Sequence, residues 1–107
     1  MPVLTLKEEL ILSAILMLGG RSRGAPIRKM VVEFSKKEIV YGTLYNLMEN
    51  LIRKGYVISQ KSDPEPVQGG RSKTVYVITN QGKAALLETM EMREEIKRHL
   101  PALEFGM

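Results

Sequence analysis

The stretch that decides the fold is Tyr41-Gly42-Thr43-Leu44-Tyr45-Asn46-Leu47-Met48-Glu49-Asn50-Leu51-Ile52-Arg53-Lys54-Gly55, followed by Tyr56-Val57-Ile58-Ser59-Gln60-Lys61. Its leucines and its methionine recur at three- and four-residue spacing, which indicates an amphipathic helix over residues 41–54 that stops at Gly55. From Tyr56 onward the pattern becomes that of a strand. The helix leaves Tyr, Thr and Asn on its outer face, where a merely solvated helix carries Glu and Lys.

Two helices are expected upstream of this stretch. Thr5-Leu6-Lys7-Glu8 is a capping box, and the helix that it opens ends at Gly19-Gly20. That helix is apolar on almost all sides, so part of it is expected to face another subunit. A basic loop, Arg21-Ser22-Arg23-Gly24, then leads to a second helix. Pro26 suits the first turn of the second helix, and its apolar stripe runs to Phe34.

Downstream, a second strand is expected over residues 74–78, after a long loop rich in proline and glycine. Thr79 is the expected N-cap of a last helix that reaches about Leu100. This order predicts an α+β fold, mostly α: a winged helix-turn-helix with three helices, a two-stranded wing and a C-terminal dimerisation helix. The third helix is then the one that enters the DNA major groove. Residues 1–78 are expected to form the DNA-binding domain, and residues 79–107 the dimerisation helix and tail.

The net charge of +4 is concentrated in the middle of the chain. Residues 21–73 carry 11 basic and 5 acidic side chains, a balance of +6, whereas each flank has a balance of −1. A concentrated basic segment is what phosphate neutralisation requires. A solvated basic surface is the alternative interpretation.

The composition argues against several other classes of protein. There is no cysteine and only one histidine, His99, so neither a disulfide framework nor a thiolate or multi-histidine metal site is expected. No cofactor is expected, and no nucleophile–base pair suggests an enzyme. The apolar run over residues 10–18 is shorter than the roughly 20 residues that span a bilayer. We therefore expect a cytoplasmic protein with no membrane contact.

Two stretches resemble the PadR family of transcriptional regulators. The start of the third helix, Tyr41-Gly42-Thr43-Leu44-Tyr45, with its continuation to Gly55-Tyr56-Val57, is similar to the recognition helix of the family. Gly70-Arg71-Ser72-Lys73-Thr74-Val75-Tyr76-Val77-Ile78-Thr79-Asn80-Gln81-Gly82 is similar to its wing and last helix. The match is collinear over residues 4–90. It implies a homodimer built through the first and last helices that binds a two-fold operator, usually as a repressor.

The sequence departs from the family pattern at two places. Tyr41 stands where Ser or Pro is frequent in the family, so the sequence does not fix the residue at which the recognition helix begins. Asp63 and Glu65 would repel phosphate, so the arm of the wing that contains Arg71 and Lys73 is the better candidate for DNA contact.

The expected base-reading face is the outer face of the recognition helix. Tyr41, Thr43 and Asn46 are expected to face the major groove. Asn46 can pair with adenine, and Thr43 offers a hydroxyl group and a methyl group for contact with thymine. Gly42 would let the backbone of the helix approach the DNA backbone closely. Tyr45 either donates its hydroxyl to a phosphate or packs into the core.

Four basic side chains are expected to neutralise phosphates: Lys36 and Lys37 before the recognition helix, and Arg71 and Lys73 on the wing. Arg71 is also suited to a narrow minor groove. For any single lysine, a solvated side chain is the alternative.

The last helix carries a stripe expected to form the dimer interface. Ala85, Met92 and Ile96 are predicted to meet Leu10 or Ile11 of the partner. The alternative is that the stripe covers the chain's own core.

The function predicted from these observations is sequence-specific regulation of transcription on double-stranded DNA. A winged-helix adaptor that binds proteins, without sequence-specific DNA binding, is the alternative. A small-molecule effector between the subunits is a further possibility, because Met90 and Met92 could line an adaptable apolar cavity there. Plain packing is the commoner role of such methionines.

Overall fold

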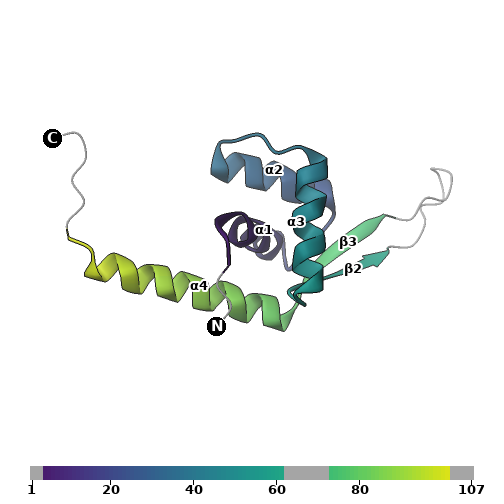
Figure 1. Ribbon diagram of the computed structural model, residues 1–107. Coiled ribbons are helices and arrows are strands. Elements are labelled where there is room, and N and C mark those ends of the chain that lie inside the picture. The colour runs from purple at the N-terminus through teal and green to yellow at the C-terminus, as the bar shows by residue number, and fades with distance from the viewer. Residues whose placement is uncertain (1–3, 62–72, 102–107) are drawn as a thin grey trace.

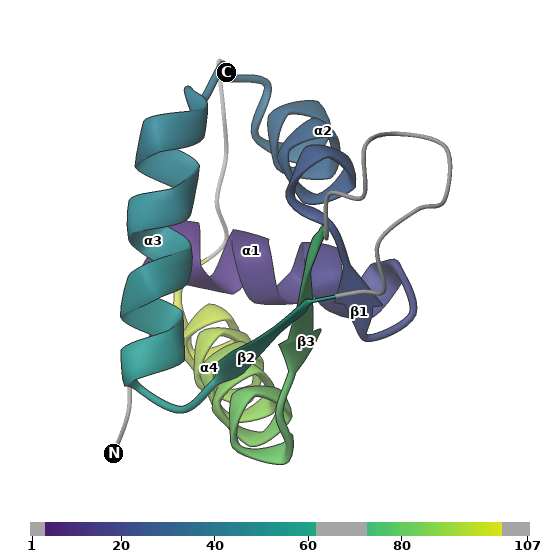
Figure 2. The same ribbon diagram turned by 90° about the vertical axis from the view of Figure 1, so that its right-hand side faces the viewer.

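The computed structural model of the protein describes residues 4–61 and 73–101 (Figure 1). Its elements are, in chain order, α1 (Leu6–Met17), β1 (Arg21–Ser22), α2 (Gly24–Ser35), α3 (Tyr41–Arg53), β2 (Val57–Lys61), β3 (Thr74–Ile78) and α4 (Asn80–His99). α1 lies in the middle, with α2 and α3 on one side of it and α4 on the other (Figures 1 and 2). The predicted winged helix-turn-helix order is confirmed.

The predicted helix ends are set by the local sequence. The Thr5 hydroxyl accepts a hydrogen bond from the Glu8 amide at 3.2 Å, and the Glu8 carboxylate accepts one from the Thr5 amide at 2.9 Å. This reciprocal pair satisfies two amides that the first turn would leave free. Gly19, Gly20 and Gly55 have φ angles of +99°, +91° and +82°, so the glycines end α1 and α3 in a conformation that other residues rarely adopt.

The sheet has one strand more than the sequence suggested. β1, expected to be a basic loop, pairs antiparallel with β3 through Arg21 opposite Val77 and Ser22 opposite Tyr76. β2 pairs with the other edge of β3, so the order is β1-β3-β2. A strand of two residues is too short to show a period, and its partner lies far along the chain. Local pattern therefore gave no sign of β1.

The core lies where α1 meets every other layer. Ile11, Leu12 and Ile15 of α1 are completely buried, as are Leu44 and Leu51 of α3, which the periodicity had placed on the buried face.

The expectation for α2 needs a correction at its last turn. Ile27 and Val31 are buried as predicted, but Phe34 is 59% exposed. Phe34 follows Val31 on the same stripe, but it lies at the surface, where it lines a groove described below.

Hydrogen bonds near Gly55 connect the end of the recognition helix to the start of α4. The Thr79 hydroxyl donates to the Gly55 carbonyl at 2.7 Å and accepts from the Gly82 amide at 3.0 Å. A methyl group at Gly82 would lie 2.3 Å from the Tyr56 carbonyl oxygen, so only glycine fits there. These contacts of Thr79 and Gly82 fix the position at which α4 begins.

A buried carboxylate fastens α1 to the end of α3. The Glu8 side chain is 5% exposed and pairs with the Lys54 ammonium at 2.6 Å. Burial by itself would raise the pKa of the Glu8 carboxyl, but hydrogen bonds from Lys54 and Thr5 and the charge of Lys54 outweigh burial and lower it. The charged form is therefore the stable one in the folded protein.

Glu8→Gln is expected to make the protein less stable and less sensitive to acid. A carboxyl whose pKa falls on folding stabilises the fold at neutral pH, and loses that contribution as the pH drops below its ordinary value of 4.5. We expect the free energy of unfolding at pH 7 to fall by about 1–3 kcal/mol. Urea denaturation between pH 7 and pH 3 measures both effects. The matched control is Glu33→Gln, at an exposed position of α2. Equal pH dependence in Glu8→Gln and the parent protein would rule out this role.

Candidate nucleic-acid interface

The outer face of α3 brings together the residues expected to read bases. Tyr41, Gly42, Thr43, Tyr45 and Asn46 all belong to the first two turns of α3, and all are exposed. Figure 2 shows α3 along one edge of the molecule, with the other described elements on its inner side only. The face is therefore open along its length.

Tyr45 matches neither of its two predicted roles completely. Tyr45 is 40% exposed, and its ring stacks on Tyr41 at a centroid distance of 5.8 Å and tilts against Tyr76 of β3 at 6.4 Å. A methyl group at Gly24 would come within 2.7 Å of the Tyr45 hydroxyl oxygen, so the phenol rests against the first residue of α2. Tyr45 thus lies at the edge of the core, with part of its ring open to a ligand.

The environment of Tyr76 keeps its phenol protonated. Burial raises the pKa of Tyr76, and the neighbouring Tyr45 and Glu49 raise it further. The Tyr76 side chain is consequently neutral at physiological pH.

The predicted phosphate-neutralising residues flank this face. Lys36 and Lys37 are exposed in the turn between α2 and α3, and Lys36 has a φ of +62°. Lys73 is exposed immediately before β3. Arg71 lies outside the described residues. The three predicted lysines that the structure describes thus lie in the turn before α3 and at the start of β3.

Three arginines were given no individual role by the sequence. Arg21 on β1 and Arg23 at the N-cap of α2 are exposed, and they had been treated only as part of a loop. Arg28 of α2 donates through Nε to the Ile39 carbonyl at 2.6 Å. A side-chain bond to a distant backbone carbonyl leaves no trace in a periodic pattern, so no signal could have identified it.

α4 extends its buried stripe past the body of the molecule. Ala85 and Thr89 are buried against the core, whereas Met92 is half-buried and Ile96 is 51% exposed. Leu100, one turn later, is 47% exposed. Figure 1 shows this last part of α4 projecting beyond α1, so no described element of the chain covers it.

The expected interface residues divide into two groups. Ile11 and Ala85 are buried in the chain's own core, at 0% and 2% exposure, which favours the alternative that this part of the stripe covers that core. The reason for Ile11 is that successive helical side chains point about 100° apart, and α1 turns this residue inward. Leu10, Met92 and Ile96 keep accessible surface and stay predictions.

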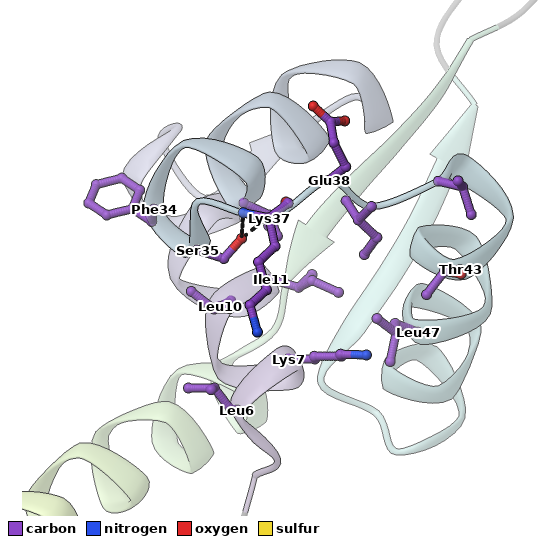
Figure 3. A pocket seen from close by; sticks show the side chains of 13 residues that line it. Leu6, Lys7, Leu10, Ile11, Phe34, Ser35, Lys37, Glu38, Thr43 and Leu47 are labelled. Carbon is purple, nitrogen blue, oxygen red and sulfur yellow. Dashed lines mark hydrogen bonds between the residues drawn. The ribbon is translucent and has the colours of Figure 1, made fainter.

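An apolar groove opens beside α1 (Figure 3). Its main cavity, of about 660 Å³, is lined by Leu6, Lys7, Leu10, Ile11, Val31, Phe34, Ser35, Lys37, Glu38, Ile39, Val40, Thr43 and Leu47. A second cavity of about 290 Å³ shares Leu6, Leu10, Val31 and Phe34 with it and reaches Met90 of α4. The groove thus runs from α4 to the start of the recognition helix.

The unpaired charges of the groove are positive, because its two acidic side chains, Glu9 and Glu38, form ion pairs with Arg93 and Arg28. In Figure 3 the Glu38 carboxylate points away from the cavity, and it pairs with Arg28 at 3.0 Å. Lys7 and Lys37 extend along the opening. Neither ammonium has an ion-pair partner within residues 4–61 and 73–101. The groove therefore combines apolar walls with two uncompensated cations.

Comparison with known families gives a match over most of the chain. Residues 11–88 match the transcriptional regulator PadR-like family. The chain belongs to this PadR-like family. The resemblance read from the sequence is therefore confirmed, and the family and fold of this PadR-like protein are those of transcriptional regulators, which are generally not enzymes.

Solved structures agree with this assignment. A transcriptional regulator from Clostridium thermocellum is 28% identical, with a TM-score of 0.66 over 85% of each chain. A PadR family transcription regulator from Clostridium difficile is 26% identical, with a TM-score of 0.70 over 85% of this chain and 90% of that one. F93 from STIV, a winged-helix DNA-binding protein, shares the fold at 20% identity, with a TM-score of 0.72 over 94% of this chain and 100% of that one. The PadR-like protein is thus a winged-helix regulator of a DNA-binding family.

No curated protein matches the sequence. Among the described helices of this PadR-like protein, none combines the length and the apolar character needed to cross a bilayer.

Proposed function

We propose that this protein is a homodimeric, sequence-specific repressor that binds a two-fold symmetric operator in double-stranded DNA. The observation that carries the proposal is the open outer side of α3, on whose first two turns Tyr41, Thr43 and Asn46 are all exposed. In helix-turn-helix proteins the N-terminal residues of the recognition helix contact base edges. Asn46 supplies the bidentate pairing that selects adenine, and Thr43 the methyl contact that selects thymine.

Gly42 supports close approach of DNA to this face. It lies in the first turn of α3, and a methyl group built on it would meet no atom within 4 Å. Its φ is not positive, so neither sterics nor backbone conformation within the chain requires glycine there. Glycine is unfavourable in a helix. A DNA backbone lying against the helix would explain why the position lacks a side chain.

Gly42→Ala is therefore expected to move stability and binding in opposite directions. The free energy of unfolding should rise by up to about 1 kcal/mol, because alanine favours the helix. Operator affinity should fall about tenfold, because a methyl group crowds the contact. Thermal unfolding and fluorescence anisotropy on one protein preparation measure the two effects. Asn50→Ala, at another exposed position near the other end of α3, is the control. Unaltered affinity in Gly42→Ala would remove the close contact from the proposal.

In the proposed dimer, the last turns of α4 from each subunit pack into the groove beside α1 of the other subunit. The overhanging stripe of Met92, Ile96 and Leu100 is not covered by any element within the described residues, and the groove beside α1 has apolar walls. Met90 of α4 lines the near end of the groove, so the groove reaches the helix that carries the overhanging stripe. A two-fold axis would let each overhang cover the partner's groove with one repeated contact.

The proposed contact rests on its apolar surfaces rather than on net charge, because residues 91–99 of α4 carry three acidic and three basic side chains.

Two recognition helices related by this axis would read half-sites about 34 Å apart, one turn of DNA. The repressor role is taken from the family resemblance. An effector between the subunits would lie next to Met90, which is half exposed at the edge of the groove.

A further inference from the structure

The start of the recognition helix is weakly held by its own sequence. The N-cap residue of α3, Val40, makes no side-chain capping hydrogen bond, and the first turn of α3 contains no acidic residue to favour the helix dipole. The first turn also contains Gly42, which favours the unfolded chain. The face that reads DNA therefore begins at a helix end that needs support from elsewhere.

Arg28 of α2 supplies contacts to that end. Its Nε donates to the Ile39 carbonyl at 2.6 Å, just before α3 begins. Its guanidinium carbon lies 5.0 Å from the centre of the Tyr41 ring, within the range of a cation–π interaction. The third contact, with Glu38 at 3.0 Å, contributes less, because the Glu38 side chain is 81% exposed.

The contact continues along a row of aromatic rings. Tyr41 stacks on Tyr45 with 25° between the ring planes, and Tyr45 leans on Tyr76 of β3. Tyr76 is 9% exposed and belongs to the core. Arg28 thus stands at one end of a row that joins α2, the first turns of α3 and the central strand of the sheet.

We propose that Arg28 is a positioning residue for DNA recognition, which fixes the angle of the α3 face through the Ile39 carbonyl and the Tyr41 ring. This rests on the proposed function. Two of its donor groups are already occupied within the chain. Because these contacts hold the Ile39 carbonyl and the Tyr41 ring, we expect Arg28 to sharpen the choice of sequence by orienting α3. Lysine cannot replace it, because an ammonium has neither the fork nor the planar face of a guanidinium.

The first test follows the helix end without DNA. In Arg28→Lys and Arg28→Gln, the amides of Leu44 and Tyr45 should exchange with solvent about tenfold faster than in the parent protein. The amide of Leu51, near the other end of α3, should keep its protection. Glu38→Gln, which removes only the exposed ion pair, should leave every rate within about twofold. Unchanged exchange at Leu44 and Tyr45 in both arginine variants overturns the proposal.

The second test measures binding to a selected operator and to a scrambled duplex at two or more salt concentrations. Both arginine variants should lose about tenfold in the ratio of the two affinities, with an unchanged salt slope. A direct phosphate contact predicts the opposite: Arg28→Lys binds normally, and Arg28→Gln loses about one unit of slope. That outcome also overturns the proposal. If exchange is faster but the parent protein prefers no sequence, the proposed function fails and the anchoring of α3 by Arg28 stands.

Discussion

Ile96→Glu is expected to convert the protein to a monomer and to weaken operator binding by about a hundredfold or more. Ile96 is the most exposed member of the stripe that α4 carries beyond the core, and in the proposed dimer it enters the apolar groove beside α1. A carboxylate there would lose the apolar contact and be desolvated against the apolar walls of the groove, a cost of several kcal/mol that the lysines at the opening offset only in part. A monomer then loses the gain in effective concentration that joins the two half-sites.

Sedimentation equilibrium and anisotropy titration of an operator duplex measure the two effects. The matched control is Leu87→Glu, the same kind of change at an exposed position on the opposite side of α4. It should stay dimeric and bind within a few-fold of the parent protein. A parent protein that is monomeric at micromolar concentration would contradict the proposed assembly, as would an Ile96→Glu variant that stays dimeric.

Asn46→Ala is expected to lower operator affinity by about 5- to 150-fold, which corresponds to 1–3 kcal/mol for one bidentate base contact. The loss should be confined to operators with the preferred base at a single position of each half-site. Binding to duplexes with another base there should change little, because the contact to be removed is already absent.

Competition titrations with operators substituted one base pair at a time provide this map. Asn50→Ala is the control, since it makes the same change one turn later, where Asn50 bonds to Arg53 within α3. If Asn46→Ala weakens all duplexes equally, the residue supports phosphate contacts and does not read a base.

The helices were predictable because their signals are local. The capping box at Thr5 and the stop at Gly55 each lie within a few residues of the end that they define. β1 was missed because its only support is a pairing with β3. Phe34 was misplaced because a stripe tells which residues share a face, but not where the covering element ends.

In the candidate site, too, the residues marked by local pattern were predictable, and those defined by contacts between distant segments were not. Helical periodicity identified the outer face of α3, because that face is defined by the buried residues opposite it. It could not identify Arg28, whose partners are the Ile39 carbonyl and the Tyr41 ring, or the resting place of Tyr45 against Gly24. Ile11 was assigned to a partner because an almost wholly apolar helix does not reveal which of its sides is outermost.

Selection of bound sequences from random duplex DNA, repeated at two salt concentrations, tests the central claim most directly. We predict enrichment of one two-fold symmetric site, with half-sites about one helical turn apart and an affinity that falls steeply as salt rises. Salt-sensitive binding without any enriched sequence would contradict the account. It would leave only a basic surface and favour a protein-binding adaptor.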